Sequence, residues 1–248
     1  MKTIKFKLSW LTSCILLLFL AGTITSCSTK KESEEHSEEA GHHDEGTEEG
    51  HGHNGEEGDQ HEEGASMESA GESMMWMPGD QPFTGMLKLA EGDAQQLAPS
   101  VTTDNDGAKV LTLTLSGDKA ILLFDGALEN LGANLQFKTD GFQGEVAIVH
   151  HYTDASNYDF VSISNAAMEL GRMQDGKKSV LNKEDKKMPA DWATLTVSSA
   201  GEHYKGLLNE ELVNHGHGET RAAGQVGVML NGKGKVMLKM MEVMNLTE

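Results

Sequence analysis

The chain has 248 residues, with 39 Asp or Glu against 20 Lys or Arg, and its formal net charge is −19 at pH 7. This charge excludes a nucleic-acid partner, because binding to phosphates needs a basic surface. Hydrophobic residues make up 38% of the chain, which is enough for one substantial core but not for a chain that is apolar throughout.

Residues 1–26 have the pattern of a secretory signal peptide. Three lysines precede an apolar run that is shorter than the roughly 20 residues needed to cross a bilayer. The run ends in Ile-Thr-Ser-Cys at residues 24–27, which resembles the lipobox of bacterial lipoproteins and implies that Cys27 becomes the lipidated first residue. The alternative is an ordinary cysteine behind a cleaved signal. Cys14 would leave with the signal, so we expect neither a disulfide nor cysteine catalysis in the mature chain.

An acidic segment follows Cys27. Its first residues, Ser-Thr-Lys-Lys-Glu-Ser-Glu-Glu, resemble the export signal of some Gram-negative lipoproteins, which implies a lipid-anchored place on the outer membrane with exposure at the cell surface. Residues 27–75 hold 16 acidic residues and two lysines. Such a segment buries too little apolar area to offset the entropy of ordering. We therefore predict that residues 27–78 form a disordered tether, on the order of 40 Å between its ends.

Histidines are concentrated in this tether. Neutral imidazole is the commonest ligand of transition metals, so His42–His43 and His51–His53 are candidate sites for Zn, Cu or Ni. A disordered segment must lose entropy to gather its ligands, and the alternative is a plain acidic spacer. A second His-Gly-His stretch, His215 to His217, is expected in a loop of the folded part, followed by Glu219. It is the more site-like of the metal candidates.

Residues 79–248 have the pattern of an all-β domain. Apolar residues recur at every second position, as in KVLTLTLSGD (109–118) and WATLTVSS (192–199), and Gly or Asp-Gly follows nearly every run. The runs recur about every 8 to 12 residues with turn signals between them. We predict an antiparallel β-sandwich with at most one short helical turn, at DAQQLA (93–98).

The order of the expected strands resembles that of concanavalin A-like, laminin-G-type jelly rolls, which occur in lectins and glucanases. The resemblance covers residues 108–244. It rests on the stretches GDKAILLFDGALENLGANLQFKT (117–139), GEVAIVHHYTDASNYDFVSI (144–163), LGRMQDGK (170–177), DWATLTVSSAGEHYKGLLNEELV (191–213) and GQVGVMLNGKGKVMLKMMEV (224–243). It implies a fold and not an activity, because one fold hosts many unrelated functions.

The same resemblance provides a test for an enzyme. Retaining glucanases of this fold carry Glu-x-Asp-x-x-Glu on one strand, so that two carboxylates face one cleft, and this spacing is absent from the domain. Glu145 and Glu169 are expected on strands, but neither has a second carboxylate two or four residues away. Hydrolysis is therefore disfavoured. Catalytic carboxylates gathered from different strands are kept as the alternative.

A sugar-binding sheet needs aromatic rings for stacking and polar groups for the sugar hydroxyls. The ligand-binding set that we predict is His151, Tyr152, Tyr158 and Trp192. Strand alternation is expected to point His151 away from His150. The alternative is that the large rings are core residues.

These patterns together predict a lipid-anchored envelope protein whose sandwich binds a glycan or another envelope component without catalysis. Two alternatives remain open at this point. One is binding or buffering of Zn, Cu or Ni by the histidines, and the other is a glycoside-processing enzyme.

Overall fold

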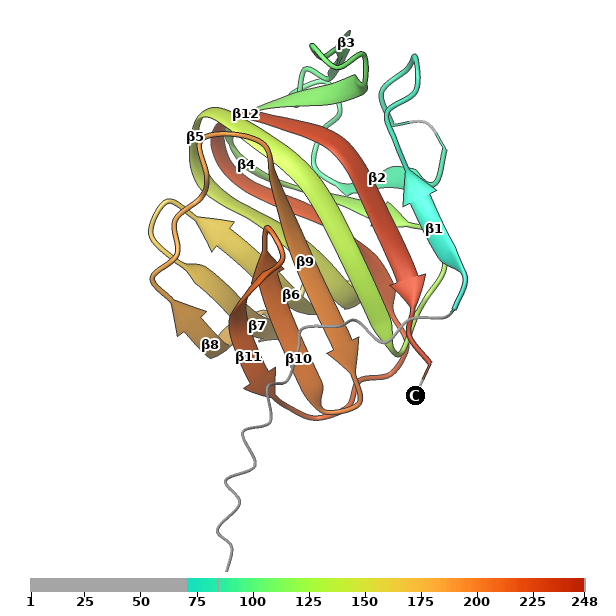
Figure 1. Ribbon diagram of the computed structural model, residues 1–248, viewed down its shortest axis with the longest axis vertical. Helices are drawn as coiled ribbons and strands as arrows, with labels where there is room; N and C mark the ends of the chain where they lie inside the picture. Colours follow the sequence, from blue (N-terminus) through green and yellow to red (C-terminus); the bar gives the residue numbers. More distant parts are fainter. Residues whose placement is uncertain (1–70, 84, 248) are drawn as a thin grey trace, which may run out of the picture. The chain divides into compact units, whose positions relative to one another are not determined.

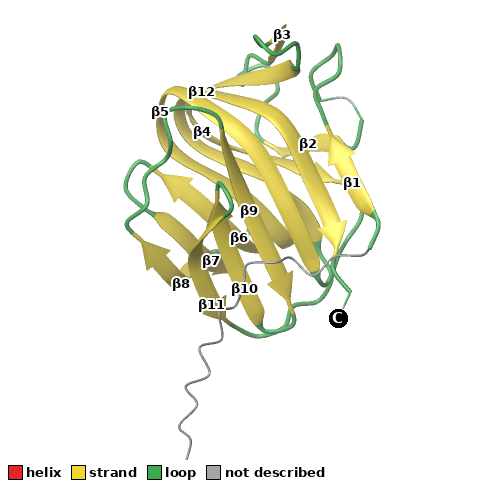
Figure 2. Cartoon of the chain, in the orientation of Figure 1, coloured by secondary structure: helices red, strands yellow, loops and turns green. Residues whose placement is uncertain are grey.

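The computed structural model describes residues 71–83 and 85–247, which belong to the unit Gln60–Glu248 (Figure 1). In these residues the chain forms β-strands and no helix, so the all-β prediction is confirmed (Figure 2). DAQQLA makes a single turn, in which the amide of Leu97 donates to the carbonyl oxygen of Asp93 at 3.0 Å. No helix of the described part is long and apolar enough to cross a membrane. The predicted signal peptide, Cys27 and the histidines of the tether lie outside the described residues.

The strands follow the alternating stretches of the sequence, and neighbouring strands pair antiparallel. In chain order they are β1 (Ser73–Trp76), β2 (Leu87–Glu91), β3 (Ser100–Thr103), β4 (Lys109–Phe124), β5 (Leu131–Asp154), β6 (Asn157–Ser164), β7 (Met168–Gln174), β8 (Lys177–Glu184), β9 (Ala193–Ala200), β10 (His203–Leu208), β11 (Glu211–His217) and β12 (Gln225–Asn245).

Three long strands, β4, β5 and β12, take part in both layers of a sandwich. The halves that pair in the first layer are residues 109–116, 131–140 and 235–245, and this layer runs β11-β10-β9-β5-β12-β4. The halves that pair in the second layer are residues 119–124, 145–154 and 225–231, and this layer runs β8-β7-β6-β5-β12-β4-β2. Figure 1 shows β9, β10 and β11 in front of β6, β7 and β8.

The bend in the long strands depends on two glycines that face each other. Gly144 of β5 and Gly232 of β12 are register partners, with φ angles of 156° and 151°. A Cβ on Gly144 would lie 2.1 Å from the carbonyl oxygen of Asn231, and one on Gly232 would lie 2.3 Å from that of Gln143. No side chain fits at either position, so the backbones approach closely where the sheet turns from one layer into the other.

The main core lies between the layers and follows from strand alternation. Fully buried residues such as Leu113, Leu135, Val161 and Leu195 point inward from the two layers. A smaller cluster lies on the outer face of the second layer. It consists of Ile121, Leu123, Ala147, Val149, Tyr152, Tyr158, Phe160 and Met229.

The folded unit begins before residue 79, within the stretch that was assigned to the tether. Residues of β1 pair with β12 from Ser73 opposite Met244 to Trp76 opposite Met241, and Trp76 is only 4% exposed. The boundary expected from the sequence is corrected to Ser73. The physical reason is that β12 supplies the ladder partners and the indole ring is buried in the main core.

We predict that Trp76→Ala destabilises the sandwich, because truncation of a buried Trp leaves a cavity and removes apolar contacts. The expected loss in the free energy of unfolding is about 3 kcal/mol. Urea unfolding of the full chain measures it. The matched control is Met77→Ala, since Met77 is 63% exposed, and it should change the free energy by less than about 0.5 kcal/mol. Equal effects of the two substitutions would show that β1 is not part of the cooperative unit.

Candidate functional site

The outer face of the first layer carries an open groove of about 710 Å³. The residues that line it are Asn134, Thr194, Thr196, Leu207, Asn209, Glu210 and Met240. Their neighbours Leu135, Leu195 and Met241 are buried in the core. Because successive side chains of a strand point to opposite faces, the groove residues of β5, β9 and β12 point outward.

A hydrogen-bonded row of polar side chains joins two residues of the groove lining to Glu242 beside them. Asn134 is the register partner of both Thr196 and Glu242. The hydroxyl of Thr196 donates to Oδ1 of Asn134 at 2.8 Å, and Nδ2 of Asn134 donates to Oε2 of Glu242 at 3.2 Å. The amide of Asn134 is thereby oriented, and the Glu242 carboxylate keeps further acceptor capacity for a ligand hydroxyl.

Trp192 lies directly before β9, at the end of the strand where Thr194 lines the groove. Its ring nitrogen donates to Oδ2 of Asp104 at 3.1 Å. The ammonium of Lys239 lies 4.8 Å from the ring centroid and 3.0 Å from the same carboxylate oxygen. The ring is half-buried and held in place by these contacts. Trp192 is the member of the predicted ligand-binding set that lies in the first layer.

The other three members, His151, Tyr152 and Tyr158, lie in the second layer and are buried. Their exposed fractions are 3%, 9% and 2%. The two tyrosine rings stack with centroids 5.9 Å apart, and the hydroxyl of Tyr152 donates to Oε1 of Glu91 at 2.7 Å. The structure therefore does not bring these residues together with Trp192, and their contact with a ligand stays a prediction.

His151 does not point away from His150, so the alternation prediction is wrong at this residue. The backbone of His151 has φ of 49°, and the pairing of β5 with β6 is irregular between His150 and Asp154. The two rings meet with their Nδ1 atoms 3.0 Å apart. Gly224 makes room for this turn, because a Cβ there would lie 2.5 Å from Cα of His151.

A buried ionic network surrounds the two rings. Arg172 donates to both carboxylate oxygens of Asp159, at 2.7 and 3.0 Å. Burial alone would raise the pKa of Asp159, but His151, whose Nδ1 lies 3.6 Å away, and the hydrogen bonds from Arg172 outweigh it and hold that pKa well below its usual range. Burial and the neighbouring His151 lower the pKa of His150 to about 3. His150 is therefore neutral at pH 7.

This network also holds the chain that follows β11. Arg172 and the hydroxyl of Tyr204 both donate to the carbonyl oxygen of Glu219, at 3.2 and 2.7 Å. Glu219 comes two residues after His217. The buried network therefore fixes the end of the strand that carries the second His-Gly-His stretch.

Two groups of side chains in the described residues have donor atoms within 4.8 Å of one another, close enough to share a metal ion. One is the buried trio His150, His151 and Asp159. Because the Arg172 guanidinium already occupies both oxygens of Asp159, a cation there would meet an adjacent positive charge. We therefore assign this trio to structure and not to metal binding.

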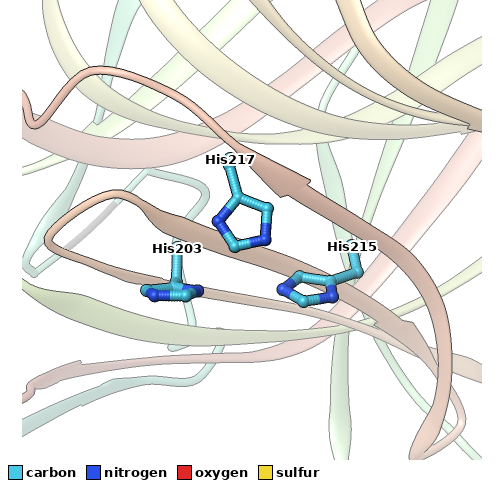
Figure 3. A group of neighbouring side chains, drawn as sticks. All are labelled: His203, His215 and His217. Carbon is cyan, nitrogen blue, oxygen red and sulfur yellow. The ribbon is translucent and has the colours of Figure 1, made fainter. Parts of the chain in front are cut away.

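The other group is exposed and consists of His203, His215 and His217 (Figure 3). The prediction that His215 and His217 lie in a loop is wrong, because both are on β11. Gly216 between them faces inward, where a Cβ would lie 2.9 Å from Cδ2 of Leu170. Alternation therefore sends both imidazoles outward while glycine allows β11 to pack on β7.

The sequence analysis missed His203, which is the register partner of His217. The β10–β11 turn has Asn209 and Glu210 at φ of 51° and 69°, and regular pairing outward from it would place His203 opposite Gly216 and not opposite a histidine. A bulge between Gly206 and Leu207 shifts the register by one residue. The extra residue is Val213 of β11, whereas β10 pairs with β9 in unbroken register. His203 therefore keeps its outward place, and the bulge turns His215 and His217 to the same face.

No protein-family model and no curated protein sequence matches the chain in the comparisons. Solved structures do match. The carbohydrate-binding module CBM66 from Bacillus subtilis has a TM-score of 0.50 and 16% identity over 64% of this chain and 99% of its own. A β-glucanase from Bacillus licheniformis has a TM-score of 0.51 and 13% identity, over 71% of this chain and 100% of its own. A β-1,3-1,4-glucanase derived from a mouse hindgut metagenome has a TM-score of 0.52 and 11% identity, over 71% of this chain and 99% of its own. At these identities the likeness shows the fold alone, a concanavalin A-like jelly roll, and the predicted fold class is confirmed.

The buried histidine gives a prediction of pH-dependent stability. Between the ordinary pKa of 6.5 and about 3 in the folded state, the unfolded chain binds a proton at His150 that the folded chain does not. The free energy of unfolding should therefore fall as the pH is lowered through this window, by about 2 kcal/mol between pH 7 and pH 5. Urea unfolding of the full chain at the two pH values measures this loss.

The control for this measurement is His150→Phe, which keeps an aromatic ring at the position but cannot titrate. The variant should lose that part of the pH dependence. Asp159 contributes only at lower pH, because its folded pKa lies below its ordinary value of 3.8. The same loss in the variant and in the unchanged chain would contradict the assignment to His150.

Proposed function

We propose that the sandwich binds a glycan in the groove on the outer face of the first layer, and that it does so without catalysis. The observation that carries the proposal is the polar row in which Thr196 and Asn134 line an open groove and Glu242 accepts a hydrogen bond from Asn134. Hydroxyl, amide and carboxylate groups on a rigid sheet are suited to hydrogen bonding with sugar hydroxyls.

The groove also offers apolar surface beside the polar row. Leu207 and Met240 line it, and these side chains can cover the C–H face of a sugar ring. No aromatic ring is among the lining residues of this groove in the described part of the chain. Hydrogen bonding must therefore supply most of the specificity. The proposal is supported by the carbohydrate-binding module and the two glucanases, because their names refer to carbohydrates and their fold is similar to that of this chain.

We predict that Met240→Trp weakens glycan binding, because the larger ring fills the groove from its apolar side. A glycan array identifies the ligand, and calorimetry of the full chain with that glycan should show a loss of affinity of at least about tenfold. The control is Met86→Trp, since Met86 is 38% exposed and outside the groove lining. If the array shows no binding, the lectin-like proposal fails and a protein partner takes its place.

The same ligand separates binding from hydrolysis. Two carboxylates, Glu210 and Glu242, lie in the groove or in contact with its lining. We predict that the chain releases no reducing sugar from a bound glycan. Glu242→Gln should weaken binding, and it should likewise release no reducing sugar. A different result would establish a glycoside hydrolase instead. In that case the unchanged chain releases reducing sugar, and Glu242→Gln or Glu210→Gln stops the release while binding is retained.

The proposal also includes anchoring of the protein to the outer membrane through lipid on Cys27. Its support comes from the sequence of residues 1–34, which lie outside the described residues. We predict that Cys27→Ser moves the protein from the membrane fraction to the soluble fraction of lysed cells, because a thioether-linked lipid can no longer form. Membrane fractionation with detection of the chain measures this, and retention of the variant on membranes would overturn the anchoring.

A further inference from the structure

Three imidazole rings converge on the outer face of the β10–β11 hairpin. Figure 3 shows His203, His215 and His217 turned toward one another from the two strands. The ring centroids of His203 and His217 lie 4.6 Å apart, and those of His215 and His217 lie 4.9 Å apart. All three side chains are exposed, and their nitrogen donors lie within 4.8 Å of one another.

The local backbone explains why the three rings share one face. Asn214 is fully buried and Gly216 packs against Leu170, so the alternate residues His215 and His217 point outward. The bulge between Gly206 and Leu207 aligns His203 with His217. Bulges that re-aim a side chain are over-represented next to functional sites.

We propose that His203, His215 and His217 form a binding site for one divalent transition-metal ion of the Zn, Cu or Ni class. The inference does not rest on the proposed glycan function. It differs from the tether sites predicted from the sequence, because its ligands stand on paired strands and include His203.

The distances allow such a site with small movements. Zinc binds imidazole nitrogen at 2.0–2.1 Å, so two nitrogens of a tetrahedral ion lie roughly 3.3 Å apart. Donors that are at most 4.8 Å apart reach this separation when exposed rings rotate about their side-chain bonds. The strands supply a fixed base, so the ion has to order only three side chains and no backbone.

The chemistry of the donors selects the class of ion. Imidazole suits Zn, Cu and Ni, whereas Ca²⁺ and Mg²⁺ prefer oxygen ligands. The register places Lys205 opposite His215 on the same face. A lysine ammonium offers no lone pair to a metal ion, so the ligands of this site are the three imidazole nitrogens.

Three protein ligands leave a fourth tetrahedral position unfilled by the chain. Three histidines and one solvent molecule form the coordination set of an open zinc site, while a structural site has four protein ligands. The exposure of all three rings leaves this position accessible from solvent. The bound ion therefore takes an exogenous ligand, such as a small anion.

The test uses the full chain in a background without the tether histidines. The residues replaced by Gln in this background are His36, His42, His43, His51, His53 and His61. Calorimetry with zinc chloride should then report one ion per chain, and calcium chloride should give no binding heat. Each of His203→Gln, His215→Gln and His217→Gln, added singly, should weaken zinc binding by at least about tenfold.

Two controls make the result specific. Glu202→Gln removes an exposed carboxylate next to His203 and should change zinc affinity by less than about threefold, or 0.7 kcal/mol. Met240→Trp blocks the proposed glycan groove and should leave zinc binding unchanged, so failure of the glycan proposal and failure of the metal proposal are distinguishable. Thermal unfolding without metal shows that each variant is folded. Zinc should raise the midpoint of the background chain and of both control variants by more than that of the three histidine variants.

Two outcomes would overturn the proposal. In the first, the background chain takes up no zinc, and in the second, its zinc binding survives replacement of all three histidines by Gln. In the second case the ion belongs to carboxylates or to the buried trio. The open position is tested by loading the background chain with Co²⁺ and adding azide. A change in visible absorption is expected, and an unchanged spectrum would contradict an accessible fourth position.

Discussion

The close approach of Gly144 and Gly232 is the contact on which the rest of the sandwich depends. Because no side chain fits between the two backbones, β5 and β12 can turn together from one layer into the other, and their pairing resumes after a register shift between Lys233 and Lys235. Both layers are therefore parts of one hydrogen-bonded sheet. The groove on the first layer and the ionic network that begins on the second share strand β5, which supplies Asn134 to the groove and His150 to the network.

Local patterning made the fold predictable, and long-range pairing limited what else could be predicted. Alternation over residues 109–118 or 192–199 is visible within one strand, and so is the punctuation by glycine. The four residues of β1 show no such pattern. Trp76 becomes a core residue only because β12, at the other end of the chain, supplies its ladder partners. The first boundary of the domain was for this reason placed too late.

The candidate sites show the same limit at the level of single residues. His215 and His217 were recognised because their spacing is local, while His203 joins them only through a bulge that shifts the register by one residue. His151 was assigned the wrong direction because its positive φ suspends the alternation on which the prediction rested. Departures from regular strand geometry thus occur at the histidines, where pattern alone carries least information.

The hold on the Glu219 carbonyl has a consequence for the surface above it. Arg172 and Tyr204 fix this carbonyl from inside the sandwich, directly after β11. The imidazoles of His203 on β10 and His217 on β11 lie on the outer side of the same layer. A preorganised strand spares a bound ion part of the ordering entropy that a loose chain would lose. The metal affinity of the exposed histidine cluster therefore depends in part on the buried Arg172 and Tyr204. Substitutions in the interior would change this affinity without changing any residue on the surface.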